Sequence, residues 1–257
     1  MLREANGGAG SQMTTPSQAK LVVLPDQAAV ARAAADWIVV LAARGESRFA
    51  LCLSGGSTPK ALYALLATPE YRDRLPWTRL HLFWGDERFV PHDDPRSNFR
   101  MTSETLLAHA PIPTENVHPI PTEGLDVQQG AAAYAETLQE FYGATTLDPQ
   151  RPLFDVTLLG LGTNGHTASL FPKSPVLKER ARWAAPVEGV ADEARVTLTY
   201  PVIESSRETA FLVVGAEKAE MLARLRAGDA TIPAGALHTL GATTIFADTA
   251  TTQGVAR

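Results

Sequence analysis

Residues 49–67 read FALCLSGGSTPKALYALLA and contain, in order, an apolar run, a small polar loop and a helix-compatible stretch. The run at 49–53 is typical of a buried strand, and the stretch 59–67 favours a helix. The loop between them holds two glycines and ends at Pro59, a residue that suits the first turn of a helix. A strand that leads directly into a helix is the building unit of parallel sheets, so this stretch predicts an α/β fold.

The same alternation recurs along most of the chain. Apolar runs predict further strands, and many of the segments between them favour helices. We therefore expect one α/β domain over residues 18–257, with a mostly parallel sheet covered on both faces. The remaining strands are expected at 20–24, 80–84, 154–159, 196–200, 210–214 and 243–247, and further helices at 97–107, 126–142 and 216–227.

The N-terminal region predicts a tail followed by a strand and a capped helix. Residues 1–17 are small and polar without periodicity, which is typical of a disordered tail. Asp26 is placed to cap the helix that follows strand 20–24, and Gly45 stands where a C-terminal capping glycine belongs.

Composition excludes several classes of protein. The formal net charge of −5 argues against bulk binding of nucleic acid. The single cysteine, Cys52, excludes an intrachain disulfide framework and a cysteine-cluster zinc site. Neither an apolar run of about 18–20 residues nor a signal-peptide core is present, so we expect a cytoplasmic chain without membrane contact.

Unusual polar segments follow four of the predicted strands. They lie at 54–59 (SGGSTP), 85–88 (GDER), 160–166 (GLGTNGH) and 215–218 (GAEK). In an open α/β sheet, ligands bind beyond the carboxyl ends of the strands. These four loops therefore predict one shared site.

The loop Ser54-Gly55-Gly56-Ser57-Thr58-Pro59 has the features of a phosphate cradle. Its glycines allow backbone N–H groups to approach a ligand, and its hydroxyls lie beside the positive end of a helix. It lacks the Gly-Lys of a P-loop. A simple capping turn and a nucleophilic Ser57 remain as alternatives, although Pro59 suits a nucleophile elbow poorly.

The segment Gly160-x-Gly-x-x-Gly165 formally matches a dinucleotide fingerprint, with Glu188 near the expected distance for a ribose contact. Pro172 would end the following helix early, so we interpret the glycines as a turn that positions His166. A histidine at a strand end can serve as a general base near neutral pH.

Charged residues at the ends of predicted elements complete the candidate set. Asp86, Glu87 and Arg88 form either a solvated turn with a local ion pair or an anion site with an ordering carboxylate. Arg195 and Lys218 are further cations, and each alone is most simply a surface charge.

Taken together, the motifs resemble the 6-phosphogluconolactonase family, within the superfamily that includes glucosamine-6-phosphate deaminases. They run in the family's order and cover roughly residues 20–250. The matching segments are LSGGSTP (53–59), GDERFVP (85–91), SNFRM (97–101), LLGLGTNGHTASLFP (158–172), RVTLTYP (195–201) and GAEKAEML (215–222).

The resemblance implies a Rossmann-like three-layer α/β/α domain that hydrolyses 6-phospho-D-glucono-1,5-lactone to 6-phosphogluconate in the oxidative pentose phosphate pathway. It implies no metal and no organic cofactor. The expected partner is a phosphosugar lactone, with no nucleic acid or membrane, and the expected state is a monomer or weak homodimer.

The resemblance also implies roles for individual residues. His166 would activate the attacking water, Arg88 would contact the substrate and its developing negative charge, and Asp86 would orient the site. The substrate-binding set would be Ser54, Gly55, Gly56, Ser57, Thr58, Asn98, Asn164, Arg195 and Lys218, with Ser57, Thr58, Arg195 and Lys218 on the phosphate.

Two positions depart from the family pattern. Asn164 stands where the family usually has aspartate, and Glu204 where asparagine is common. The deaminase branch carries a glutamate where this chain has Phe171, which favours hydrolysis over isomerisation. A non-catalytic sugar-phosphate sensor is the alternative from another class, and Asn164 lends it some support.

Overall fold

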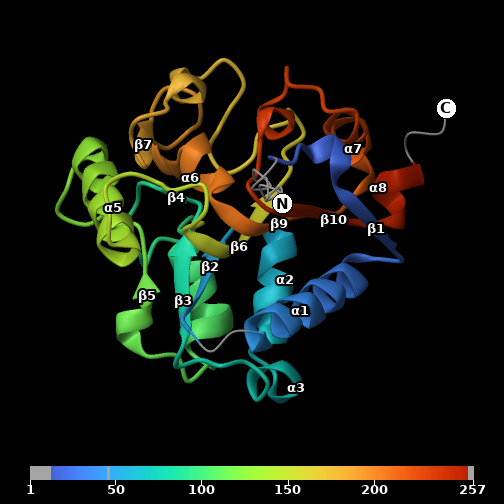
Figure 1. Ribbon diagram of the computed structural model, residues 1–257, viewed down its shortest axis with the longest axis horizontal. Helices are drawn as coiled ribbons and strands as arrows, with labels where there is room; N and C mark the ends of the chain where they lie inside the picture. Colours follow the sequence, from blue (N-terminus) through green and yellow to red (C-terminus); the bar gives the residue numbers. More distant parts are fainter. Residues whose placement is uncertain (1–12, 45–46, 254–257) are drawn as a thin grey trace, which may run out of the picture.

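The computed structural model describes residues 13–44 and 47–253 and places a seven-stranded sheet at the centre of the molecule (Figure 1). The strand order is β1-β10-β9-β6-β2-β3-β5, and every pairing between neighbours is parallel. The strands are β1 (Lys20–Leu24), β2 (Phe49–Leu53), β3 (Leu80–Trp84), β5 (Val117–His118), β6 (Phe154–Gly160), β9 (Ser206–Val213) and β10 (Ala242–Asp248).

The predicted α/β fold with a mostly parallel sheet is confirmed. Strand β2 is buried along its whole length, as expected for a strand that lies between two others in a covered sheet. Figure 1 shows α1 and α2 on one side of the sheet, and α6 and α7 on the other. The helices are α1 (Gln27–Ala43), α2 (Ser57–Leu66), α3 (Pro69–Arg72), α4 (Asn98–Thr102), α5 (Val127–Tyr142), α6 (Tyr200–Glu204), α7 (Ala219–Arg226) and α8 (Thr249–Gln253).

Local capping explains where the two long helices begin. The side chain of Asp26 accepts a hydrogen bond from the backbone N–H of Ala29, so it caps α1 as predicted. In α5, Asp126 and Gln129 form a reciprocal capping box, and Gly143 ends the helix in the left-handed conformation. The predicted C-cap of α1, Gly45, lies outside the described residues.

The strand expected at 196–200 does not join the parallel sheet. Residues Arg195–Leu198 form β8, which pairs antiparallel with β4 (Asp86–Arg88) and β7 (Ala184–Val187) in a separate three-stranded sheet. The chain then turns into α6 at Tyr200. An apolar run predicts a strand but does not indicate its partner, and Pro201 stands in the first turn of a helix.

Two of the predicted helices are not α-helical throughout: one ends in a π-helical turn, and the other begins with a 3₁₀ turn. The helix expected at 97–107 consists of α4 followed by a π-helical turn over Ser103–Leu107. The one expected at 216–227 begins with a 3₁₀ turn over Ala216–Lys218 and continues as α7.

The first part of the predicted tail, residues 1–12, lies outside the described residues. Its last part makes specific contacts, because Thr14 and Thr239 exchange backbone hydrogen bonds of 2.8 and 2.9 Å. Pro16, at the start of a 3₁₀ turn over Pro16–Gln18, is buried. Within residues 13–44 and 47–253, no helix has the length and apolar character needed to cross a membrane.

Candidate active site

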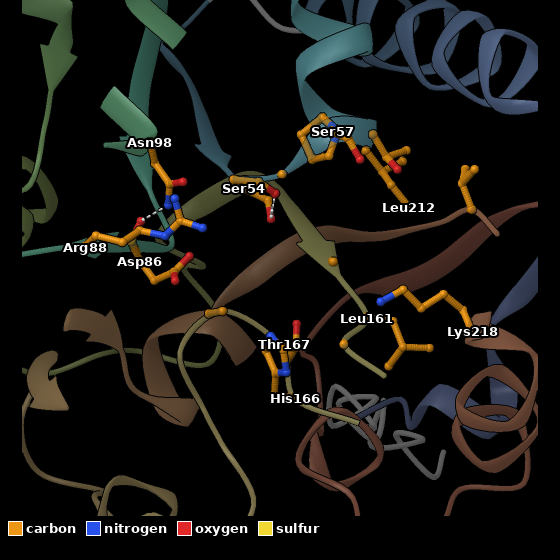
Figure 2. A pocket seen from close by; sticks show the side chains of 18 of the residues that line it. Ser54, Ser57, Asp86, Arg88, Asn98, Leu161, His166, Thr167, Leu212 and Lys218 are labelled. Atoms are coloured by element: carbon orange, nitrogen blue, oxygen red, sulfur yellow. Dashed lines mark hydrogen bonds between the residues drawn. The ribbon is translucent and has the colours of Figure 1, made fainter. Parts of the chain in front are cut away.

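A cavity of about 340 Å³ opens at the carboxyl ends of the central strands (Figure 2). The four loops singled out by the sequence all contribute to its wall, as the α/β fold predicts. Its lining comprises Ser54, Gly55, Gly56, Ser57, Thr58, Pro59, Asp86, Arg88, Asn98, Gly160, Leu161, Gly162, His166, Thr167, Ala168, Arg195, Leu212, Val214, Glu217 and Lys218.

The loop after β2 brings its backbone and the start of α2 to the cavity. Helix α2 begins at Ser57. Its N-cap residue, Gly56, has φ of +106°, a conformation that residues other than glycine rarely adopt. A Cβ on Gly55 would lie 2.1 Å from Oδ1 of Asn98, so only glycine lets these two segments approach. The hydroxyls of Ser57 and Thr58 therefore stand at the positive end of a ten-residue helix.

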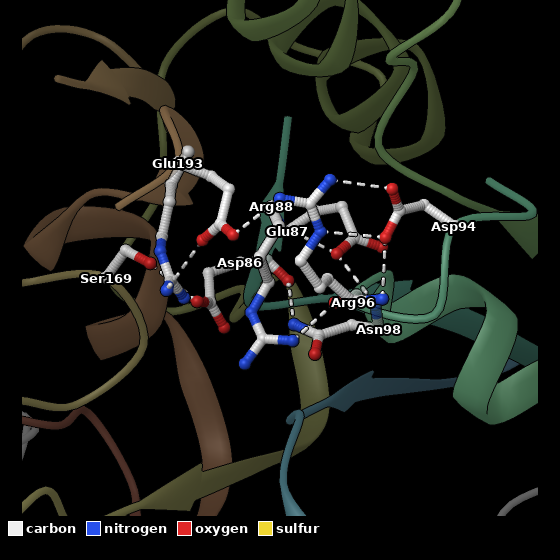
Figure 3. Close-up of polar contacts among 9 residues, drawn as sticks. Asp86, Glu87, Arg88, Asp94, Arg96, Asn98, Ser169 and Glu193 are labelled. Carbon is white, nitrogen blue, oxygen red and sulfur yellow. Dashed lines mark hydrogen bonds and ion pairs between the residues drawn. The ribbon is translucent and has the colours of Figure 1, made fainter. Parts of the chain in front are cut away.

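The segment after β3 is a short buried strand, β4, and not a solvated turn. Glu87 is 1% exposed and accepts a hydrogen bond of 2.7 Å from the backbone N–H of Asn98 (Figure 3) and another of 2.7 Å from the backbone N–H of Phe99. Its carboxylate also accepts from the backbone of Arg88 and from the Ser97 hydroxyl. Glu87 thus ties the start of α4 to β4 and faces away from the cavity lining.

Asp86 points the other way along β4, into the cavity. Its carboxylate accepts a 2.6 Å hydrogen bond from the Ser169 hydroxyl, and its backbone carbonyl accepts one from the Asn98 amide. Asp86 is 7% exposed, so its orientation is fixed by these neighbours. Alternation along a strand explains why Asp86 and Glu87 have opposite roles.

His166 stands at the end of a tight glycine turn after β6. Oδ1 of Asn164 lies 2.6 Å from Nδ1 of the imidazole and 3.1 Å from the backbone nitrogen of His166. The ring packs against Phe171, with centroids 4.7 Å apart. A Cβ on Gly162 would lie 2.0 Å from Nδ1, so this glycine makes room for the ring.

The electrostatic surroundings of His166 favour the neutral imidazole. Burial lowers the pKa of His166, and the nearby charge of Asp86 raises it. The charges of Lys218 and Arg195, which line the same cavity, lower it further. A neutral imidazole is the form that accepts a proton.

Two arginines face each other across the small sheet. Arg88 on β4 pairs with Arg195 on β8 in the antiparallel register. The Nε atoms of both are buried and have no hydrogen-bond partner among the described residues. Both residues line the cavity, so the pair brings two guanidinium charges to its wall.

The cations are partly held by protein groups. Arg88 donates to the backbone carbonyl of Arg96, while Glu193 lies 2.8 Å from Arg96 and 3.9 Å from Arg195 (Figure 3). The side chain of Lys218 extends from a 3₁₀ turn toward the centre of the cavity (Figure 2). Positive charge therefore reaches the cavity from the three-stranded sheet, through Arg88 and Arg195, and from the loop after β9, through Lys218.

The structure brings eleven of the twelve candidate residues to one cavity wall. Asn164 is the exception, since it is exposed and contacts the cavity only through His166. Glu204 lies elsewhere, on α6, where its carboxylate accepts from the backbone N–H of His238.

The candidate residues predicted from the sequence do not include several lining residues. Three of these adjoin predicted site residues, namely Thr167, Ala168 and Glu217. Thr167 and Ala168 directly follow His166, and Glu217 directly precedes Lys218. Proximity to those motifs was the available signal. Ala168 has φ of +46°, an unusual conformation for a residue with a side chain, and it lies beside the histidine.

Two alternative interpretations of the glycine loops lack structural support. No helix follows the Gly160–Gly165 turn before residue 175, so no helix N-terminus receives a pyrophosphate there. Glu188 bonds to Gln128 and does not line the cavity. Among the described residues no histidine hydrogen-bonds the Ser57 hydroxyl, and none of their acidic, histidine or cysteine side chains cluster as a metal site would require.

Comparison with known proteins identifies the family. A family model described as glucosamine-6-phosphate isomerases/6-phosphogluconolactonase matches residues 25–246. The chain belongs to this family. The resemblance seen in the sequence motifs is thus confirmed over most of the chain.

Two relatives within the glucosamine-6-phosphate isomerase/6-phosphogluconolactonase family are similar over three quarters or more of their length. A 6-phosphogluconolactonase of Nostoc sp. is 40% identical over 211 residues, which cover 81% of this chain and 85% of the relative. One from Synechocystis sp. is 43% identical over 190 residues, covering 74% and 75%.

Solved structures of the family share the fold. A 6-phosphogluconolactonase from Thermotoga maritima superposes with a TM-score of 0.76 at 27% identity, over 90% of this chain and 99% of that one. A monomeric glucosamine-6-phosphate deaminase reaches a TM-score of 0.77 at 20% identity, over 91% of this chain and 99% of its own. This second likeness shows the fold alone, so the choice of reaction rests on the site.

Proposed function

We propose that this protein hydrolyses 6-phospho-D-glucono-1,5-lactone to 6-phosphogluconate, as the names of its family relatives also indicate. One observation carries the proposal: a half-buried histidine with a lowered pKa shares a cavity with Arg88, Arg195 and Lys218. Opening a lactone needs a deprotonated water and a stabilised oxyanion, and remote phosphate binding holds the ring in place.

His166 is the general base in this proposal. Nδ1–H of His166 donates a hydrogen bond to Oδ1 of Asn164, so the lone pair of the neutral ring is on Nε2. Nε2 has no hydrogen-bond partner among the described residues. Nε2 takes a proton from water as the water oxygen attacks the lactone carbonyl. The carbonyl oxygen becomes an oxyanion, the ring C–O bond then breaks, and the leaving hydroxyl recovers the proton from His166.

The arginine pair stabilises the oxyanion. The guanidinium groups of Arg88 and Arg195 both line the cavity and are held on paired strands, β4 and β8, so their positive charge is already in place when negative charge develops. Asp86 lies among these groups, held by Ser169, and keeps the cations and the imidazole in orientation.

The phosphate lies at the start of α2 in this proposal. Ser57 and Thr58 supply hydroxyls and backbone donors there, and Lys218 supplies a cation that reaches the same cavity. Arg195 pairs with Arg88 across β4 and β8 and lines the same cavity, so in this proposal it also reaches from the ring end toward the phosphate.

Hydrolysis is favoured over the isomerase–deaminase reaction by the neighbour of the imidazole. Phe171 packs against His166 at the position where the deaminase branch carries a glutamate. A phenyl ring takes up no proton, so the acid–base partner for moving hydrogen between sugar carbons is missing at that place. We expect a monomer or weak dimer to be active, which gel filtration beside the assay will test.

The decisive experiment is a continuous lactonase assay on freshly generated 6-phosphogluconolactone, corrected for spontaneous hydrolysis. We expect turnover by the wild-type protein and a loss of about 10²–10⁴-fold in kcat for His166→Ala, the range typical of a general base. His238→Ala is the matched control, because His238 is exposed and lies outside the cavity. Binding of 6-phosphogluconate without turnover would favour the sensor and overturn the proposal.

A further inference from the structure

Tyr63 binds the backbone of the first residue of the phosphate-binding loop. Its phenol oxygen accepts a 2.9 Å hydrogen bond from the N–H of Ser54 and donates one of 2.8 Å to the C=O of the same residue. Tyr63 is fully buried on α2. Both hydrogen bonds of one phenol therefore serve a single peptide residue at the cavity wall.

Tyr134 makes the same pair of hydrogen bonds to one residue of β3, the neighbour of β2 in the sheet. Its phenol oxygen accepts a 2.9 Å hydrogen bond from the N–H of Trp84 and donates one of 2.9 Å to the C=O of Trp84. Tyr134 is also fully buried, on α5. Trp84 is the last residue of β3 and stands two positions before Asp86.

Sheet topology explains why both positions need such a partner. The ladder between β2 and β6 ends at Cys52 and Thr157, and that between β3 and β5 ends at Phe83 and His118. In an extended strand the N–H and C=O of one residue point to the same side. Ser54 and Trp84 therefore each present two backbone groups beyond the end of a ladder, in the interior, where water does not satisfy them.

A phenol suits this position because one atom both donates and accepts. Burial raises the pKa of both tyrosines, so the hydroxyl proton is retained at any physiological pH. The phenol thus takes the place of the missing neighbouring strand and fixes the residue from which each site loop departs.

We propose that Tyr63 and Tyr134 are positioning residues for the two halves of the site: Tyr63 for the phosphate-binding loop and Tyr134 for Asp86 and Arg88. The kinetic part of this inference rests on the proposed lactonase function. Neither phenol lines the cavity, so each acts only through the backbone that it holds.

Tyr142 provides a matched control within the same chain. Its phenol accepts a 2.8 Å hydrogen bond from the N–H of Asp148 and donates one of 2.7 Å to the C=O of Arg151. It is 3% exposed, and neither it nor its two partners line the cavity. Tyr142→Phe therefore removes the same chemistry at a place remote from the site.

The test compares Tyr63→Phe, Tyr134→Phe and Tyr142→Phe in the full chain, at a temperature where all are folded. We expect Tyr63→Phe to raise KM for the phosphorylated lactone about tenfold with little change in kcat. Tyr134→Phe should lower kcat about tenfold with little change in KM, because it displaces the groups at the reacting carbonyl. Tyr142→Phe should change neither.

Amide hydrogen exchange gives a second readout that does not depend on activity. Exchange should accelerate at residues 54–58 in Tyr63→Phe and at 84–88 in Tyr134→Phe, and at neither segment in Tyr142→Phe. If wild-type protein has no lactonase activity, the proposed function fails while exchange still decides the role of the tyrosines.

Unchanged local exchange, or kinetic constants equal to those of Tyr142→Phe, would overturn the inference. Failure of both site variants to fold would also overturn it, because the phenols would then support the whole domain and not two loops.

Discussion

Oδ1 of Asn164 lies 2.6 Å from Nδ1 of His166 and 3.1 Å from the backbone nitrogen of the same residue. One neutral oxygen thus fixes both the tautomer and the orientation of the imidazole. Because this oxygen belongs to an amide, the site holds its histidine without an adjacent negative charge. The negative charge that acts on the ring comes instead from Asp86, on β4.

Introducing a carboxylate at residue 164 should alter the pH dependence. We expect Asn164→Asp to raise the pKa of His166, because a negative charge stabilises the imidazolium. The acid limb of the kcat/KM profile should then move up by about one pH unit. The measurement is the pH–rate profile of both proteins, and an unmoved limb would show that residue 164 does not act on the base electrostatically.

The pH–rate profile of the wild-type protein should show activity that falls at acid pH. The active form is the neutral imidazole, so activity falls as pH drops through the pKa of His166. Burial, Lys218 and Arg195 lower that pKa below its ordinary value of about 6.5. The midpoint of the acid limb, where half of the maximal activity remains, should therefore lie below about pH 6.5. Asp86 raises the pKa, so Asp86→Asn should move the acid limb lower still, in addition to any loss of kcat. A limb that moves upward in Asp86→Asn would contradict this assignment.

Removal of the cation at residue 218 should separate binding from chemistry. We expect Lys218→Ala to raise KM for the phosphorylated lactone by roughly 10–100-fold with a smaller effect on kcat, because a charge-assisted contact is lost in both ground and transition states. Lys178→Ala, an exposed lysine outside the cavity, is the control. Equal KM values for wild type and Lys218→Ala would place the phosphate elsewhere.

Glu87 should matter for stability. Its buried carboxylate accepts from three backbone N–H groups and the Ser97 hydroxyl. Glu87→Gln replaces one accepting oxygen with a donating NH₂ group that faces those donors, so we expect a loss of about 1–3 kcal/mol in the free energy of unfolding. Urea denaturation measures it, with the exposed Glu220→Gln as control. A stability equal to wild type would mean that the donors find other acceptors.

The pH dependence of that stability also has a definite direction. Burial raises the pKa of Glu87, although the hydrogen bonds from Asn98, Phe99, Arg88 and Ser97 oppose the shift. A raised folded-state pKa means that the folded chain holds this proton more tightly than the unfolded chain. The contribution of Glu87 is therefore largest at low pH and declines as pH rises from the unfolded pKa to the folded one.

Periodicity and glycine-rich loops predicted the central sheet and the edge at which the site lies. Strand 49–53, the following loop and the helix over Ser57–Leu66 depend on local sequence, so they were accessible to this reasoning. The convergence of four loops then follows from parallel topology alone.

Features that depend on distant partners were not accessible. The strand at Arg195–Leu198 pairs with Asp86–Arg88, and no local pattern indicates which sheet a run of alternating residues joins. The roles of Tyr63 and Tyr134 depend on where neighbouring ladders end, which is a property of the assembled sheet. The buried state of Glu87 follows from the same pairing, since the three adjacent charges alone resemble a surface turn.

The position of β10 between β1 and β9 has a consequence for biosynthesis. Lys20 on β1 is in register with Thr244 on β10, so β1 has no neighbour in the sheet until residues 242–248 have left the ribosome. Nascent chains that lack β10 should therefore keep this edge open to chaperones and proteases, until β10 pairs with β1 and closes it.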